Sequence, residues 1–215
     1  AISESNYFFL KDELSLKNIK YIHPCENINL YYEHNQNYIN FLNLNNKKKN
    51  LMYIFENHKL KQSLLKAASR KKNIRLINKN INSFDVNDGS ILVNGKKTKY
   101  DLIILSVGNQ STLYKKIGKD RSIRKNYNEK AITAIIKHNL NISNASQYFL
   151  KEGPLAILPI KKNLSSLIWS VNNNFFENYK YDLKNILEEK VKKILKNKIK
   201  ISIHNIQSFP IHLNI

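Results

Sequence analysis

Glycine is scarce in this chain of 215 residues. The five glycines stand at positions 89, 95, 108, 118 and 153, so no Gly-x-Gly-x-x-Gly turn can form within it. Such a turn lets backbone N–H groups approach a dinucleotide pyrophosphate at a helix N-terminus. The sequence therefore lacks the usual cradle for dinucleotide phosphates.

Other absences exclude several kinds of chemistry. The single cysteine, Cys25, excludes an internal disulfide and a multi-cysteine metal site. The histidines show no His-x-x-x-His spacing of a zinc site, and no Gly-x-Ser-x-Gly hydrolase motif occurs. No apolar run reaches the roughly 18 residues of a membrane-spanning helix, and the N-terminal residues do not resemble a signal peptide. These features predict a globular, cytoplasmic protein.

Positive charge is abundant, with a formal net charge of +20. Clustered Lys and Arg side chains would suggest a nucleic-acid partner. Here the lysines are scattered among many Asn and Ile residues, and no nucleic-acid motif accompanies them. Nucleic-acid binding is therefore disfavoured, and weak attraction to anionic membrane surfaces is the alternative use of this charge.

The first half of the chain predicts a mixture of helices and strands. Alternating apolar residues predict a hairpin at 28–33 and 38–42, and short helices are predicted at 6–14 and, with Asn57 as N-cap, from 57 to about 69. Further strands are predicted at 74–77, 81–86 and 91–93. The apolar run 100–105 is typical of a strand buried on both faces of a parallel sheet.

The second half predicts an antiparallel sheet and one long helix. Strands are expected at 131–137, 147–150, 155–160, 166–171 and 199–206, and an amphipathic helix at 182–198. Pro154 and Pro159 lack the donor N–H, so their strand should lie at a sheet edge or be interrupted where its backbone faces something other than a strand. A ligand is one such neighbour.

This Gly-Pro segment carries a family resemblance. Phe149-x-x-x-Gly-Pro-Leu-Ala-x-Leu-Pro159, followed by Ser-Ser-x-x-Trp-Ser at 165–170, resembles the ubiquinone-biosynthesis hydroxylases, which are FAD-dependent aromatic monooxygenases. The segments at 53–57, 127–131 and 145–149 are similar to further motifs of that family, in the same order. Gly108 and Ser111 match its Ala-Asp-Gly-x-x-Ser turn near the flavin, whereas Val107 replaces the Asp.

The resemblance implies a mixed α/β fold with two lobes. A partial, Rossmann-like FAD-binding lobe is expected at 1–125, with 1–55 also contributing hairpin segments to the substrate lobe. An antiparallel, helix-covered substrate lobe is expected at 126–206, with 207–215 returning toward the FAD lobe. The family's two flavin-phosphate motifs are expected to lie outside this chain, which we interpret as a partial or truncated product.

The resemblance also implies a function and its residues. The expected reaction is hydroxylation of the aromatic ring of a polyprenylated ubiquinone precursor, with FAD as cofactor, NAD(P)H as transient reductant and O₂. The flavin carries this chemistry, so no catalytic side chain is assigned. The expected cofactor contacts are Asn57, Gly108, Asn109 and Ser111. The expected substrate contacts are Phe149, Pro154, Leu155, Ile157, Pro159 and Trp169.

Two alternatives to the hydroxylase remain open. The chain is either this hydroxylase or a degenerate, non-catalytic homologue without flavin binding, a hypothesis that Val107 supports because its side chain cannot accept a hydrogen bond. A basic protein that binds polyanions or membrane surfaces is the third hypothesis. The first one implies a lipophilic aromatic ligand, other ubiquinone-biosynthesis proteins as partners, and a peripheral position at the inner membrane.

Overall fold

The computed structural model describes residues 1–13, 22–46, 49–85, 87–107, 124–196 and 199–214. Its contacts divide the chain into two compact units. Unit 1 contains residues 1–71 and 128–211, and unit 2 contains residues 72–127 and 212–215. The two lobes predicted from the family resemblance have different boundaries and stay predictions.

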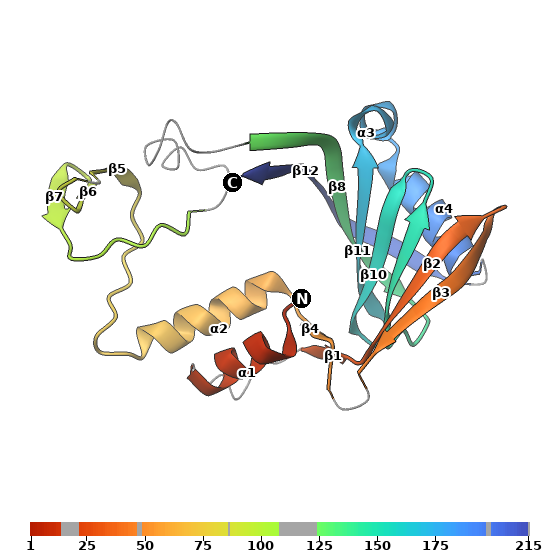
Figure 1. Cartoon of the computed structure of the whole chain (residues 1–215), viewed down its shortest axis with the longest axis horizontal. Coiled ribbons are helices and arrows are strands. Elements are labelled where there is room, and N and C mark those ends of the chain that lie inside the picture. Colours follow the sequence, from red (N-terminus) through yellow and green to blue (C-terminus); the bar gives the residue numbers. More distant parts are fainter. Residues whose placement is uncertain (14–21, 47–48, 86, 108–123, 197–198, 215) are drawn as a thin grey trace. The chain divides into compact units, whose positions relative to one another are not determined.

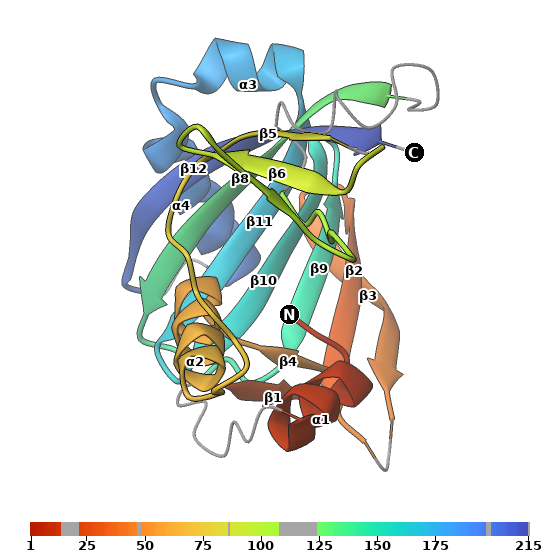
Figure 2. The same ribbon diagram turned by 90° about the vertical axis from the view of Figure 1, so that its left-hand side faces the viewer.

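A seven-stranded sheet dominates unit 1 (Figures 1 and 2). Its strand order is β12-β8-β11-β10-β9-β2-β3. The bounds are β2 Asn27–His34, β3 Asn37–Asn45, β8 Arg124–His138, β9 Ala145–Leu150, β10 Gly153–Lys161, β11 Leu164–Asn172 and β12 Ile201–Asn214. The pair β2 and β9 is parallel, so the sheet is mixed rather than purely antiparallel. The predicted α/β class is confirmed.

Strand β10 lies in the middle of the sheet, so the first of the two predicted alternatives, an edge strand, is wrong, whereas the second, a strand interrupted at its prolines, agrees with the pairing. It pairs with β9 on one side and β11 on the other. Its two prolines stand where pairing begins or fails: Pro154 precedes the first residue paired with β11, and Pro159 lies beyond the last residue paired with β9. A missing N–H therefore costs little at either position.

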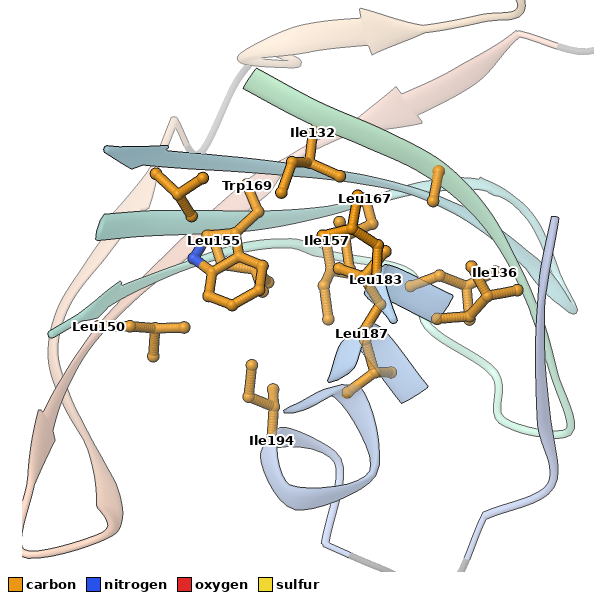
Figure 3. Close-up of a cluster of buried hydrophobic side chains, with 14 of the residues drawn as sticks. Ile132, Ile136, Leu150, Leu155, Ile157, Leu167, Trp169, Leu183, Leu187 and Ile194 are labelled. Carbon is orange, nitrogen blue, oxygen red and sulfur yellow. The ribbon is translucent and has the colours of Figure 1, made fainter. Parts of the chain in front are cut away.

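One face of the sheet is covered by helices. Helix α4 (Leu183–Ile194) presents Leu183, Leu187, Val191 and Ile194 to it, and all four are buried. They pack with Leu155, Ile157, Leu167 and Trp169 in one apolar cluster (Figure 3). The single helix predicted at 182–198 is thus shorter, and a second helix precedes it: α3, Asn173–Tyr179, capped by the Asn172 side chain, which accepts from the Phe175 N–H at 2.7 Å.

The remaining elements of unit 1 are two helices and two short strands. They are α1 (Glu4–Glu13), β1 (His23–Cys25), β4 (Met52–Ile54) and α2 (Asn57–Ser69). Strands β1 and β4 pair with each other, and a second buried cluster joins them to the large sheet through Cys25, Ile54, Ala145 and Ile160. The predicted cap of α2 is wrong by one residue. Glu56 occupies the N-cap position, and Asn57 is the first helical residue.

Unit 2 contains a three-stranded antiparallel sheet. Its strands are β5 (Ile81–Asp85), β6 (Ser90–Val93) and β7 (Lys96–Lys99), joined by turns at Gly89 and Gly95 with φ values of +64° and +76°. Two predicted strands are absent: residues 74–77 and 100–105 have no regular pairing. Leu102 and Ile104, predicted as buried, are 76% and 78% exposed. A buried parallel strand needs neighbours on both sides, and the described residues provide none for this segment.

Candidate functional site: the open face of the sheet

We call the sheet face opposite α4 the open face. Because side chains alternate along a strand, each strand that contributes to the core also contributes to this face. Register places one row of residues across six strands: Thr133, Ile168, Ala156, Gln147, Leu30 and Leu42. A neighbouring row contains Pro154, Phe149, Tyr32 and Ile39. These two rows are mostly apolar, and their polar side chains are Thr133, Gln147 and the hydroxyl of Tyr32.

Three rings gather on this face and form what we call the aromatic patch. The ring of Phe41 lies 5.9 Å from that of Phe149 and 6.0 Å from that of Tyr32. The three side chains are 51%, 43% and 40% exposed, respectively. Pro154 is the register partner of Phe149, so the Gly-Pro segment borders the patch. Rings and a proline at such spacing offer flat apolar surface to an aromatic ligand.

The turn before Pro154 is held rigidly from the core side. Gly153 has φ +131°, and a Cβ there would lie 2.1 Å from the backbone oxygen of Ser170. The indole Nε1–H of Trp169 donates to the Gly153 carbonyl at 3.2 Å. Only glycine fits this close approach, and the hydrogen bond fixes the peptide that leads into Pro154.

An ion pair ties the same turn to α4. The Lys190 ammonium donates to Glu152 Oε1 at 2.8 Å and lies 5.7 Å from the Trp169 ring centroid. Burial by itself would raise the pKa of the Glu152 carboxyl. The hydrogen bond from Lys190, a backbone hydrogen bond and the charges of Lys190 and Lys193 together outweigh burial, so this pKa lies below its usual value. Glu152 is therefore charged at neutral pH and holds Lys190 over the indole.

The six predicted substrate residues divide between the two faces. Phe149 and Pro154 lie on the open face. Leu155, Ile157, Pro159 and Trp169 face the core instead, and Leu155 and Trp169 are 0% exposed. Strand alternation turns these four side chains away from the open face, and Leu155, Ile157 and Trp169 pack in the apolar cluster under α4. Contact of any of the six with a ligand stays a prediction, and the geometry favours Phe149 and Pro154.

Of the four predicted cofactor contacts, the structure describes Asn57 alone. Gly108, Asn109 and Ser111 lie outside the described residues. Asn57 is exposed at the start of α2 and makes no capping hydrogen bond. The described glycines, Gly89, Gly95 and Gly153, all stand in turns that lead into strands, so none of them opens a helix N-terminus toward a phosphate. The described residues thus do not fit the pyrophosphate of FAD.

The described part of the chain offers neither a metal site nor a membrane-spanning helix. No group of three His, Cys, Asp or Glu side chains there could hold a metal ion. None of the described helices combines the length and apolarity needed to cross a membrane. A groove of about 460 Å³ lies elsewhere in unit 1, but its lining is polar and does not suit an apolar ring: Glu4, Glu26, Asn27, Asn45, Asn46, Lys49 and Asn50.

Sequence reasoning missed the hairpin's part in the site. Tyr32 and Phe41 belong to the predicted hairpin, yet the sequence does not say that β2 pairs in parallel with β9, which brings both residues to Phe149. Glu152 and Lys190 were missed as well, since they are 38 residues apart. For the hairpin, the sequence did contain a signal: Tyr32 and Phe41 are aromatic residues within its two short predicted strands.

The fold is shared with FAD-dependent monooxygenases and halogenases. The flavin-dependent brominase Bmp2 superposes with a TM-score of 0.72 at 11% identity, covering 100% of this chain and 57% of that protein. PqsL of Pseudomonas aeruginosa, described as a probable FAD-dependent monooxygenase, gives 0.72 at 10% identity, covering 89% and 56%. The myxobacterial halogenase CndH gives 0.73 at 12% identity, covering 100% and 55%.

Curated relatives narrow this class and support the resemblance to the ubiquinone-biosynthesis hydroxylases. The ubiquinone biosynthesis monooxygenase COQ6 of Danio rerio, a mitochondrial protein, is 33% identical over 40% of this chain and 18% of its own length. COQ6 of Dictyostelium discoideum is 30% identical over 56% of this chain and 29% of its own length. The matched parts span less than a third of either relative. No protein-family model matches the chain.

Proposed function

We propose that this chain is the substrate-binding part of an FAD-dependent monooxygenase that hydroxylates the aromatic ring of a polyprenylated ubiquinone precursor. The observation that carries the proposal is the aromatic patch beside Pro154, on the open face of a sheet that has the monooxygenase fold. The similarity to COQ6 supports the substrate class. FAD, reduced by NAD(P)H, would supply the oxygen-transfer chemistry.

The chain's own residues would bind and orient the ring. Phe149 and Tyr32 offer ring faces, and Pro154 is held in place by the Trp169 hydrogen bond and the Glu152–Lys190 pair. Ala156 and Ile168 continue the apolar surface across the sheet. A surface of this kind excludes water from a bound ring, and it needs no general acid or base from this chain.

The proposed substrate also suggests where the protein works. A polyprenyl chain resides in a membrane, so a peripheral position at the inner membrane, aided by the net charge of +20, would bring the enzyme to its substrate. Other ubiquinone-biosynthesis proteins are the proposed neighbours there.

Ligand binding tests the proposal directly. A short-chain prenylated 4-hydroxybenzoate should bind the chain, and Phe149→Asp should weaken binding at least about tenfold, because a carboxylate would be desolvated against the ring. Phe9→Asp, at a 62% exposed site on α1, is the matched control and should bind as the wild type does. Equal affinity of all three proteins would refute the open face as the site.

A non-catalytic homologue is the second candidate. It is favoured by Val107 and by the absence of a pyrophosphate cradle among the residues that the structure describes. Equilibrium dialysis against FAD tests whether this chain contains a complete cofactor site, which neither candidate requires. We expect no stoichiometric FAD binding at low micromolar concentration, because the remaining contacts cannot offset the cost of ordering a large ligand. Stoichiometric binding would contradict this and favour an enzyme that is active as it stands.

A further inference from the structure

Strand β3 is a free edge of the seven-stranded sheet. It pairs with β2 on one side and is the last strand in the order (Figures 1 and 2). No other strand among the described residues pairs with its outer side along Asn37–Asn45. An edge of this kind leaves a row of backbone N–H and C=O groups ready to pair with another strand.

Strand β3 has no charged residue or proline to protect it as a sheet edge, and its one irregularity is the bulge between Leu30 and Tyr31 in its pairing with β2. Proteins guard such edges with lysine, proline or a covering element. Between Glu33 and Lys47 no Lys, Arg, Asp, Glu or Pro occurs, although charged residues make up 24% of the chain. The opposite edge, β12, carries Pro210, which has no N–H to donate. Strand β3 is therefore the edge that is open to pairing.

Apolar side chains make the unpaired strand costly to leave in water. Ile39, Phe41, Leu42 and Leu44 are 40%, 51%, 44% and 41% exposed. They are interspersed with Asn37, Asn40, Asn43 and Asn45, and Asn side-chain amides can both donate and accept hydrogen bonds. A neutral strand of this composition matches another neutral strand.

We propose that β3 pairs antiparallel with β3 of a second copy of this chain, joining two seven-stranded sheets about a two-fold axis. Charge favours this occupant. Two chains of net charge +20 repel each other over most of their surfaces, and the segment from His34 to Asn46 is where they can meet without opposing lysines. Antiparallel pairing also brings the Glu33 end of one strand beside the Lys49 end of the other.

Sedimentation equilibrium of the whole chain tests the proposal. We expect a monomer–dimer equilibrium that strengthens as salt is raised above about 0.1 M, because salt screens the repulsion between the two chains. Asn43→Lys puts a charge into each of the two paired strands, where the neutral partner strand offers no counter-charge, and should weaken the dimer at least about tenfold. Asn80→Lys, the same change at an exposed site in unit 2, is the control and should leave the dimer unchanged.

A second measurement needs no variant. Hydrogen exchange at rising protein concentration should show new protection confined to amides of Asn37–Asn45. A monomer at every concentration, open-ended polymers, equal effects of the two lysines, or protection that appears elsewhere would each overturn the pairing. Circular dichroism of Asn43→Lys should match that of the wild type, so that lost association is not lost folding.

Discussion

At the scale of single residues, Gly153 joins the conformation of the chain to the candidate site. Its positive φ and the 2.1 Å approach to Ser170 both exclude a Cβ. Gly153→Ala should therefore lower the free energy of unfolding by about 3 kcal/mol, since backbone strain and overlap add. Urea unfolding followed by the fluorescence of Trp169, the single tryptophan, measures the loss. Lys151→Ala, in the same turn but exposed, is the control, and an equally small effect at Gly153 would contradict the geometry.

A second residue gives the fold a dependence on pH. His138 is 6% exposed, donates from Nδ1 to the Leu140 carbonyl at 3.0 Å and accepts at Nε2 from the Ser165 hydroxyl at 2.9 Å. This donor assignment follows from the partners, because a carbonyl can only accept. Burial lowers the pKa of His138 below 6.5, although the bond to Leu140 opposes the shift. The imidazole is thus neutral in the folded chain.

The sign of the pH effect follows from that lowered pKa. Below about pH 6.5 the unfolded chain binds a proton at His138 that the folded chain does not, so this contribution is complete above pH 6.5 and declines as the pH falls toward the folded pKa. The stability lost on His138→Gln should therefore be larger at pH 7.5 than at pH 5. Asn163→Gln, an exposed change next to β11 that removes no titratable group, should change stability equally at both pH values. A pH-independent loss at His138 would contradict the prediction.

At the scale of elements, an ion pair between Lys190 and Glu152 joins α4 to the β9–β10 turn. The side chains of Lys190 and Glu152 are only 15% and 27% exposed. Lys190→Met should cost about 1–3 kcal/mol, because it leaves a carboxylate partly buried without its partner. The double variant with Glu152→Gln should recover part of the loss, and the Trp169 emission should shift in the single variant. Lys184→Met, exposed on the same helix, is the control.

The elements also show how far the sequence could predict this molecule. Residues 145–172 read correctly as strands because apolar alternation, the Gly-Pro start and the turn at 162–163 all agree with the observed β9, β10 and β11. The runs at 74–77 and 100–105 failed because their apolar character specifies burial but cannot supply a partner strand. The residues of the aromatic patch and its border have two origins. Phe149 and Pro154 came from the motif, whereas Tyr32 and Phe41 reach it through a parallel pairing of β2 with β9 between segments more than 100 residues apart.

At the scale of the whole molecule, the two units differ in the apolar core that each contains. Unit 1 encloses a large cluster with Trp169, Leu187 and Val191 all at 0% exposure. Among the described residues of unit 2, Ser90 alone is buried. The apolar side chains of Ile74, Leu76, Leu102 and Ile104 are exposed. A three-stranded sheet with so little buried apolar surface is marginally stable by itself.

Hydrogen exchange should resolve this difference. Amides of β8, β10 and β11 should exchange only in rare, large-scale opening, whereas those of β5, β6 and β7 should exchange at rates close to those of an unfolded chain. Leu167→Ala removes a fully buried side chain from the core and should cost about 2–5 kcal/mol, so protection in β8, β10 and β11 should fall by at least about tenfold. Leu102→Ala, at a 76% exposed position, should leave those amides unchanged. Equal protection in both units would show that unit 2 gains its stability from more than its own core.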